Sequence, residues 1–385
     1  MKHRLFEIIG ILSLSFIICS TMAVSSGIPQ MMEQFPSHSR ASLEFLMSAP
    51  TIAILTMIAL TPFLSRFVNE HALICLGLCL IGSAGVLPFF VQSYPAMLCS
   101  RLGLGMGIGL MNPHAVALVG EHFHGELRQR LQGIRCSIET LGEATLIFIA
   151  GQLLVLGWQY SYLIYLVSFI VLILYLCFVP KEMPKESADS LEETTEKRPL
   201  LMEEIKVIAF GAGLGFLLVA ALTSVAMRMS SFVVSAGFGD AVQASTVLSL
   251  SIVSGFAGGI CFGKLLECLN RLLLPVALIA VGSGLVIAAF STSLLMVGLG
   301  TCLFGFFATV GLSYMFNSVS DRLPSDALTT GNAIVLVGCN LGAATSPFQL
   351  QFFDLFSSSL AFGFLGYAFF ALLLAIGFFI SNKKK

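Results

Sequence analysis

The sequence predicts an all-α membrane protein with twelve transmembrane helices in two pseudo-symmetric six-helix bundles. Of its 385 residues, 57% are hydrophobic and only 11% are charged, whereas soluble domains carry about 25% charged residues. The apolar residues form recurring runs, each close to the roughly 20 residues that an α-helix needs to cross the hydrocarbon core of a bilayer. One polar segment, Pro180–Glu204, divides these runs into two sets.

Charged residues separate the apolar runs in the first half of the chain. Cutting there gives six expected spans: Phe6–Ile28, Phe45–Leu64, Ala72–Gln92, Met97–Val119, Ile134–Leu156 and Ser161–Val179. The dividing segment is rich in Glu, Lys, Ser and Thr, which is typical of a solvated linker. We therefore expect an N-terminal bundle at residues 1–180, a linker at 181–206 and a C-terminal bundle at 207–385.

The second half repeats the pattern of the first. Its expected spans are Val207–Ser230, Ala241–Leu265, Leu272–Phe290, Leu294–Asn317, Ala327–Leu350 and Ala361–Ile380. Residues 272–320 contain no charge. We divide this run at residues 291–293 because it is too long for a single crossing.

The twenty Lys and Arg residues predict the orientation. With the N-terminus inside, sixteen fall on the cytoplasmic side, Arg40 falls outside, and Arg101, Arg135 and Arg228 fall within spans. Positive residues favour the cytoplasmic side of a membrane. We therefore expect a multi-pass protein of the plasma membrane with both termini in the cytoplasm.

Composition and motifs exclude several other classes of function. A net charge of −1 provides no basic field for a nucleic acid. The ten cysteines lack the spacing of a zinc site or a disulfide framework, so we interpret them as small core residues. No nucleotide-binding loop or nucleophile elbow is present, so we expect no cofactor, no metal and no enzyme activity. A membrane sensor is also disfavoured, because the linker is too short for a sensory domain.

Degenerate motifs recur at corresponding places in the two halves. After the second span, the chain keeps only the first arginine, Arg66, of a Gly-x-x-x-Asp-Arg-x-Gly-Arg pattern. The other fixed positions of that pattern are occupied by Thr61, Ser65, Val68 and Asn69. In the second half, the glycine, the acid and the last arginine remain, as Gly263, Glu267 and Arg271. The fourth span begins an Arg-x-Gly-x-Gly-x-Gly run at Arg101, and the fifth has glycines at nine-residue spacing, Gly133, Gly142 and Gly151.

Taken in this order along two six-helix halves, these motifs resemble those of the major facilitator superfamily of secondary transporters. The resemblance implies a monomer that moves a small-molecule substrate by alternating access, and it implies that Arg101 belongs to the proton or substrate path. The fifth span lacks the Gly-Pro-x-x-Gly-Gly core of typical drug and proton antiporters.

Three ionisable residues share one stripe of the fifth span. Arg135, Glu139 and Glu143 are four residues apart and so lie on one face of a helix. A charge inside the bilayer costs at least ~2.5–3.5 kcal/mol, so such a stripe is expected to face a water-accessible cavity. Glu143 lies roughly 15 Å along the helix from Gly133, near the expected midplane.

We expect Glu143, together with Glu139, to bind and release protons, because burial and a like-charged neighbour both favour the neutral acid. The alternative is a structural ion pair between Arg135 and Glu139, with Glu143 hydrogen-bonded to a neighbouring helix. For Arg135 we favour the structural role.

Other polar residues within spans allow two interpretations each. Arg101 could serve as the counter-charge of Glu143, bind an anionic substrate, or bond backbone carbonyls. Arg228 is expected to reach the lipid headgroups, with substrate binding as the alternative. His114 could relay a proton, but satisfaction by a neighbouring helix is favoured.

The loop residues Arg66, Gly263, Glu267 and Arg271 are expected to form cytoplasmic gates made of charge pairs and helix-end contacts. The alternative is that the positive residues only set topology. The expected function is proton-coupled export of amphipathic, drug-like compounds. The alternative is import of a small anion by Arg101 and Arg228, as in the cyanate and nitroimidazole branch of the superfamily.

Overall fold

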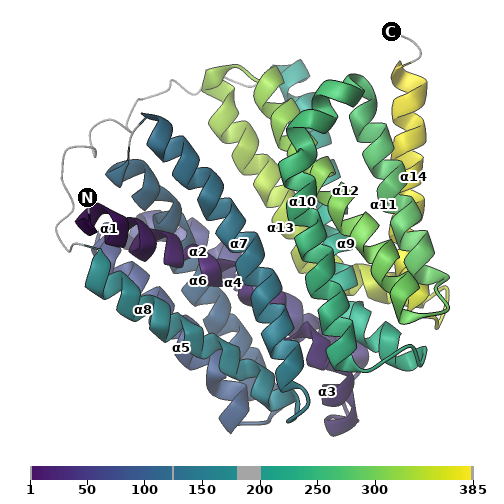
Figure 1. The fold of residues 1–385 in the computed structure, drawn as a ribbon, viewed down its shortest axis with the longest axis horizontal. Helices are drawn as coiled ribbons and strands as arrows, with labels where there is room; N and C mark the ends of the chain where they lie inside the picture. Colours follow the sequence, from purple (N-terminus) through teal and green to yellow (C-terminus); the bar gives the residue numbers. More distant parts are fainter. Residues whose placement is uncertain (1, 124, 180–200, 383–385) are drawn as a thin grey trace. The chain divides into compact units, whose positions relative to one another are not determined.

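The computed structural model describes residues 2–123, 125–179 and 201–382. Within these ranges the secondary structure is helical and includes no strand, which confirms the all-α class. The chain divides into two compact units (Figure 1), with Met1–His38 and Phe45–Glu196 in unit 1, and Ser39–Glu44 and Lys197–Lys385 in unit 2. The expected linker lies mostly outside the described residues, and helix α9 begins at Met202 instead of Val207.

Unit 1 contains five long or medium helices and a first crossing that is broken into short pieces. Its α-helices are α1 (Lys2–Ser13), α2 (Ser15–Ile18), α3 (Ile28–Gln34), α4 (Arg40–Leu64, whose first residues belong to unit 2), α5 (Glu70–Phe90), α6 (Tyr94–His122), α7 (Gly125–Leu153) and α8 (Val167–Phe178). Its 3₁₀ turns are η1 (Ser20–Met22), η2 (Ser25–Gly27) and η3 (Trp158–Leu166).

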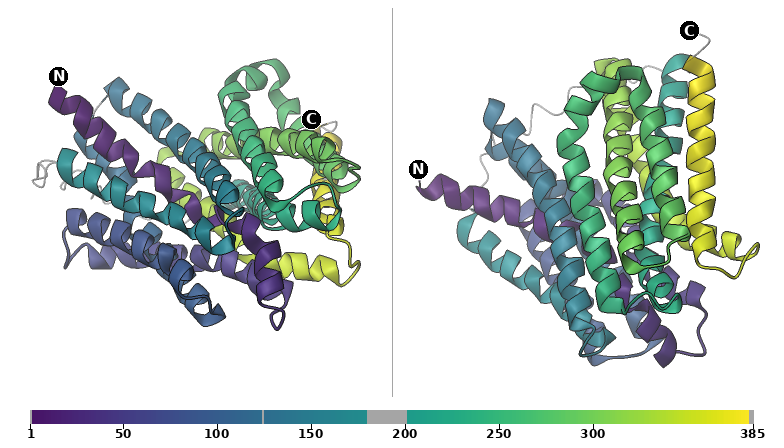
Figure 2. Two further views of the ribbon diagram at one scale, coloured as in Figure 1. Left: turned by 60° about the horizontal axis from the view of Figure 1, so that its bottom comes forward. Right: turned by 45° about the vertical axis from the view of Figure 1, so that its right-hand side comes forward.

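Unit 2 is built from six long helices that run side by side (Figures 1 and 2). They are α9 (Met202–Ser235), α10 (Ala241–Leu269), α11 (Leu273–Ala289), α12 (Leu294–Arg322), α13 (Ser325–Asp354) and α14 (Ala361–Asn382), with the short turn η5 (Asn270–Leu272) between α10 and α11. The gap between α11 and α12 confirms the predicted division of the uncharged run at residues 291–293.

The described helices are consistent with twelve crossings. Nine stretches are long and apolar enough to span a membrane, and the bent first helix makes a tenth. One of the nine, Ala241–Ala289, contains both α10 and α11. Helix α7 is also long, with 29 residues, but it is less apolar because it carries the charged stripe.

The first expected crossing is not one continuous helix. Its two parts, Phe6–Ile18 and Ser20–Gln34, meet at an angle of 44°. Pro29 has no N–H to donate, and in a continuous helix its ring would clash with the carbonyl of Ser25. Serine hydroxyls also compete for backbone groups, which favours turns over regular helix. The sequence between Ile18 and Ile28 therefore forms 3₁₀ turns.

Glycines set the close helix packing, and they do so in the same way in both units. A Cβ at Gly142 of α7 would overlap the carbonyl oxygen of Phe16, and one at Gly342 of α13 would overlap that of Phe216. Phe216 and Gly342 each stand 200 residues after Phe16 and Gly142. Small residues allow membrane helices to approach closely, so this shared contact reveals the repeat of the two halves.

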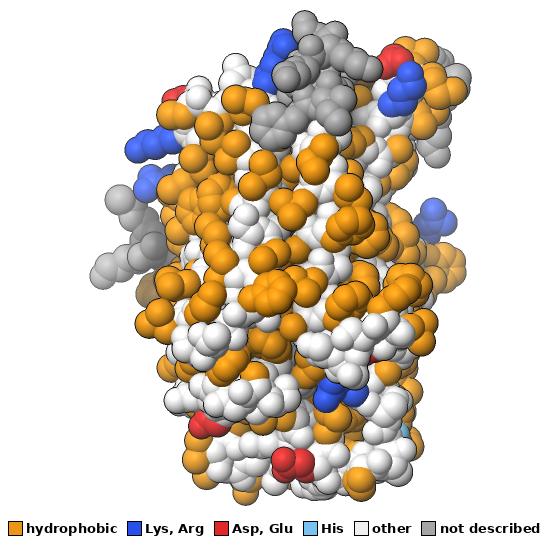
Figure 3. Space-filling model, turned by 90° about the vertical axis from the view of Figure 1, so that its right-hand side faces the viewer, with side chains coloured by type: hydrophobic (Ala, Val, Ile, Leu, Met, Phe, Trp, Pro, Cys, Tyr) orange, Lys and Arg blue, Asp and Glu red, His pale blue; other side chains and the backbone are white. Residues whose placement is uncertain are grey.

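The surface shown in Figure 3 has a broad belt of hydrophobic side chains, with most charged side chains toward its two ends. Large exposed apolar residues are expected where a protein meets lipid instead of water. The ten cysteines are free. The interpretation of all of them as core residues was wrong, because a small apolar thiol also suits a lipid-facing helix surface. Exposed cysteines are Cys79, Cys99, Cys136, Cys177 and Cys268.

Candidate functional site

Helix α7 places its charged stripe inside unit 1. The guanidinium of Arg135 donates to the carboxylate of Glu139, and the two side chains are only 13% and 19% exposed. Arg135 also donates through Nε to Gln132 at 2.9 Å. The structure thus contains the Arg135–Glu139 ion pair of the structural interpretation, and this pair leaves Glu143 as the remaining acid of the stripe.

Glu143 lies one turn further along α7, beside the break in the first helix. Its side chain is half-buried, and it makes no hydrogen bond or ion pair with a described residue. The adjacent Gly142 packs directly on the backbone of Phe16 in α2. Cys19, at the start of the break, lies within electrostatic range of the carboxylates of Glu143 and Glu139. Glu143 is therefore a carboxylate in an interior position without a fixed cation.

The broken helix brings further polar groups into unit 1. The hydroxyl oxygens of Ser15, Ser20 and Ser25 are buried and have no hydrogen-bond partner among the described residues. The carbonyl of Ser20 accepts a hydrogen bond from the hydroxyl of Tyr165 at 3.0 Å. Unsatisfied buried polar groups are costly and rare in folded proteins. Their concentration in one crossing marks this region as polar interior instead of lipid-facing surface.

Arg101 of α6 is completely buried and is surrounded by tyrosines. Its Nη1 donates to the hydroxyl of Tyr165 at 2.9 Å, and its Cζ lies 4.8 Å from the ring centroid of Tyr162. No carboxylate among the described residues forms an ion pair with it. The expectation that Arg101 is the counter-charge of Glu143 is therefore wrong for this conformation. Tyrosine rings and hydroxyls stabilise a buried guanidinium without neutralising it.

His114 has an acidic partner that the sequence did not identify. Its Nδ1 lies 3.6 Å from Oε1 of Glu70, the first residue of α5, and the histidine side chain is 6% exposed. The favoured interpretation was satisfaction by a neighbouring helix, and α5 supplies the partner.

Arg228 of α9 is held by two carboxylates. It donates through Nε to Oε1 of Glu44 at 2.9 Å and through Nη1 to Oδ1 of Asp354 at 2.7 Å. Its side chain is only 1% exposed. The expectation that Arg228 reaches the headgroups was wrong, because interior acids make extension to the membrane surface unnecessary. Glu44 and Asp354 were missed because they lie just outside the expected apolar spans.

The expected gating residues are exposed. Arg66 lies in the turn after α4, Gly263 and Glu267 lie in the last turns of α10, and Arg271 lies in η5. None of the three charged residues forms an ion pair within the described part of the chain. A Cβ added to Gly263 would meet no other atom within 4 Å. In this conformation these residues are solvent-facing helix ends.

Unit 2 has an open apolar groove of about 650 Å³ along α9, α13 and α14, and its wall residues Phe348 and Phe352 are 54% and 55% exposed. Gln349 is its main polar feature and is fixed at both ends, because it accepts from Tyr367 at 3.0 Å and donates to Thr345 at 2.9 Å. This volume falls within the range of small-molecule sites, about 300–1,000 Å³. The walls include Phe216, Leu217, Phe348, Phe352, Phe353, Phe370 and Leu374.

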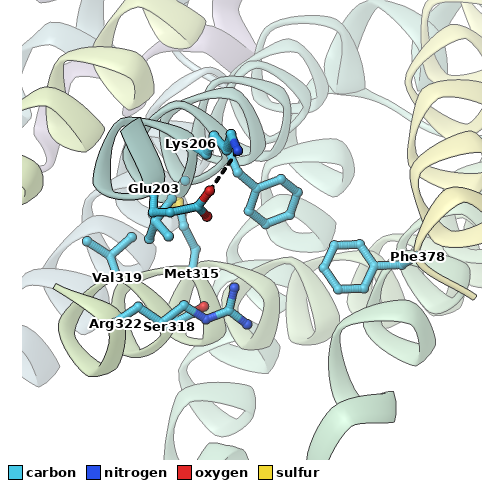
Figure 4. Close-up of a pocket in the computed structure, with 10 residues that line it drawn as sticks. Glu203, Lys206, Met315, Ser318, Val319, Arg322 and Phe378 are labelled. Atoms are coloured by element: carbon cyan, nitrogen blue, oxygen red, sulfur yellow. Dashed lines mark hydrogen bonds and ion pairs between the residues drawn. The ribbon is translucent and has the colours of Figure 1, made fainter. Parts of the chain in front are cut away.

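A second cavity, of about 200 Å³, lies at the N-terminal end of α9. Figure 4 shows Lys206 bonded to Glu203, with Arg322 of α12 and Phe378 of α14 at other edges of the space. Lys206 precedes Arg228 by 22 residues, which corresponds to roughly 33 Å along the helix. This cavity is small for a drug-sized ligand, so the larger one is the better candidate for substrate.

Solved structures with similar folds include several transporters. The chain matches nucleoside transporter NupG at 16% identity with a TM-score of 0.75, covering 100% of both chains. It matches a peptide transporter POT in complex with alafosfalin at 12% identity and 0.75, covering 98% of this chain and 94% of that one. A bacterial homologue of the human lysosomal transporter Spinster matches at 14% and 0.73, covering 100% and 97%. At these identities the likeness concerns the fold.

Sequence comparisons identify the family. No curated protein sequence matches at a significant level. The family model described as the Major Facilitator Superfamily matches residues 10–347, which is most of the chain. With its two helical units and its transporter-like fold, the chain belongs to the Major Facilitator Superfamily.

Proposed function

We propose that this transporter uses a proton gradient to export small amphipathic compounds, with Glu143 as the group that couples proton movement to transport. Coupling requires a side chain that takes up a proton when it is open to one side of the membrane and releases it when it is open to the other. Carboxylic acids at interior positions serve as proton relays in pumps and transporters.

The observation that carries the proposal is the position of Glu143. It is an acid within a membrane helix, half-buried, with no hydrogen-bond or ion-pair partner among the described residues. Arg135 already neutralises Glu139 one turn away. An isolated carboxylate in this position is costly when charged, so a proton or a cationic group of the substrate is its natural partner.

Competition between proton and substrate for Glu143 would couple their movements. When Glu143 is protonated, its site is neutral. The transporter can then switch between its inward-facing and outward-facing conformations without carrying an uncompensated carboxylate charge across the membrane. When the site opens to the side of lower proton concentration, the proton leaves and the ionised carboxylate can attract a substrate amine. Exchange of one partner for the other at a single carboxylate gives antiport by alternating access.

The open 650 Å³ groove of unit 2 supports an amphipathic substrate. Its aromatic walls suit the apolar body of a small molecule, and the amide of Gln349 provides a polar contact. Phenylalanine side chains, such as Phe348 and Phe352, provide apolar contact without demanding one exact hydrogen-bonding pattern. Such a groove would accept compounds of similar shape and varied polar groups.

The proposal includes the topology and the gates. We place both termini on the cytoplasmic side of the plasma membrane because positive residues gather there in a twelve-span arrangement. Arg66, Glu267 and Arg271 would form their charge pairs in a different conformation from the one described. We propose that the transporter functions as a monomer.

Import of a small anion is less well supported. That mechanism needs Arg228 to offer positive charge, yet Arg228 contacts two carboxylates, Glu44 and Asp354. Two acids and one guanidinium repel an additional anion. Arg101 has no such acid, but it is 0% exposed.

Replacing Glu143 with Gln tests the coupling role. Purified protein in proteoliposomes would be given a pH gradient and a panel of fluorescent amphipathic amines, and accumulation of dye against its gradient would be followed. We expect Glu143→Gln to lose uphill accumulation and to keep only a weaker downhill exchange of dye, because the amide preserves shape but neither titrates nor attracts the amine. Glu33→Gln, at an exposed position in α3, is the matched control and should behave as the wild type. Undiminished uphill transport by Glu143→Gln would rule out this role.

A further inference from the structure

The cluster of Glu44, Arg228 and Asp354 joins the first turns of α4, which belong to unit 2, to helices α9 and α13. Glu44 accepts from Nε at 2.9 Å and from Nη2 at 3.4 Å, so it faces one edge of the guanidinium. Asp354 accepts from Nη1 at 2.7 Å and also from Nη2. The arginine fork is thereby shared between a residue in the first turns of α4 and the last residue of α13.

This cluster lacks one positive charge. It contains two carboxylates and a single guanidinium, and both Glu44 and Arg228 are 1% exposed, whereas Asp354 is 38% exposed. Water can solvate the carboxylate of Asp354. The unbalanced negative charge of the cluster therefore destabilises the buried carboxylate of Glu44 more than that of Asp354. Burying a carboxylate without full compensation is unfavourable.

The other groups near Glu44 do not remove this imbalance. Arg40 lies one turn earlier on α4, is only partly buried, and contributes a weaker attraction than Arg228. Tyr367 of α14 also lies within electrostatic range, but it is neutral and its hydroxyl is hydrogen-bonded to Ser224 and Gln349. A proton on Glu44 would balance the cluster and leave Arg228 paired with Asp354 alone.

The position of Glu44 gives its protonation a consequence for movement. Residues Ser39–Glu44 belong to unit 2, and from Phe45 onward α4 belongs to unit 1. The hydrogen bonds from Arg228 therefore hold Glu44, the last residue of this segment, directly before the chain continues into unit 1. Loss of the negative charge removes the ionic part of that attachment.

We propose that Glu44 is a second proton-binding site of this transporter, and that its protonation releases segment Ser39–Glu44 from Arg228. The proton comes from water and binds a carboxylate oxygen of Glu44, while Arg228 keeps Asp354 as its counter-ion. This inference rests on the proposed proton-coupled function. It adds an ion pair at the start of α4 that protonation breaks. Glu143 and Glu44 would then act at separate positions, in unit 1 and unit 2.

Hydrogen–deuterium exchange of the full-length protein in lipid nanodiscs tests the proposal. The readout is exchange in a peptide covering Leu43–Met47, at acidic and at neutral pH, with labelling times corrected for the intrinsic pH dependence of exchange. We expect the wild type to exchange severalfold faster at acidic pH. Glu44→Gln should exchange rapidly at both pH values, since its amide cannot form the ion pair.

Two variants make the result specific. Asp354→Asn should move the transition of the wild type to lower pH, because Arg228 then has Glu44 as its only acid. Glu143→Gln should keep the wild-type transition, so failure of the coupling role of Glu143 would be seen in transport and not in this measurement. The proposal is overturned if the wild-type peptide exchanges independently of pH, or if Glu44→Gln matches the wild type.

Discussion

Two buried arginines are stabilised in different ways. Arg228 is paired with carboxylates, so its charge is neutralised. Arg101 is instead surrounded by Tyr162 and Tyr165, and its Nε has no hydrogen-bond partner among the described residues. A cation over a desolvated aromatic ring gains about 2 kcal/mol or more. The positive charge at Arg101 therefore persists in unit 1, where Glu143 is the acid that lacks a cation.

The hydroxyl of Tyr165 is expected to be important for stability because it connects two parts of unit 1. It accepts from Arg101 and donates to the carbonyl of Ser20. Tyr165→Phe leaves both groups unsatisfied, and a hydrogen bond to a charged group contributes about 1.5–3 kcal/mol. Thermal unfolding in detergent should show a clear loss of stability. Tyr160→Phe removes a hydroxyl that makes no hydrogen bond in the described structure and should change little; equal effects of the two variants would contradict the assignment.

At the scale of the helix, the glycines of the sequence motifs act through packing. Gly105 of α6 meets the carbonyl of Pro50 in α4, and Gly107 meets that of Gly77 in α5. Successive glycines of the Arg101 motif thus face different neighbouring helices. The motif that suggested the family is explained by this close approach, because no larger residue leaves room for both neighbours.

Two glycines of α7 allow the effect of helix packing on stability to be distinguished from the effect of helix propensity. Gly142 contacts the backbone of Phe16, whereas a Cβ at Gly133 would meet nothing within 4 Å. Gly142→Ala should destabilise the protein by roughly 1–3 kcal/mol, the usual cost of overpacking. Gly133→Ala should stabilise it by up to about 1 kcal/mol, because alanine is the better helix former. Denaturation midpoints of the two variants would check the signs, and a stable Gly142→Ala would refute the tight contact.

Across the whole molecule, the two units share their packing and differ in their charges. The contacts Phe16–Gly142 and Phe216–Gly342 repeat at an interval of 200 residues. Glu143 has Ala343 at the corresponding position of unit 2, and Arg228 corresponds to Ile28 of unit 1. The scaffold is thus pseudo-symmetric, while the chemistry is divided between a lone acid in one unit and an ion cluster in the other.

Hydrophobic runs predicted the helices well because crossing a bilayer imposes length and apolarity on each one. They could not predict the break in the first crossing, since Ser20, Ser25 and Gly27 fit within an apolar run and only Pro29 signals an interruption. The ion pair of Arg135 and Glu139 followed from helical spacing. The partners of Arg101, Arg228 and His114 did not, because each lies on another helix, far away in the sequence.

The central claim is that Glu143 lines a path open to water. In a background lacking the ten native cysteines, Glu143→Cys and Ile173→Cys would each be exposed to a small, charged, membrane-impermeant thiol reagent in proteoliposomes. Ile173 lies on the apolar helix α8 and is 60% exposed in the absence of lipid. We predict rapid modification at position 143 and none at 173, where lipid should exclude the reagent. Modification at 143 no faster than at 173 would contradict a water-accessible path along α7.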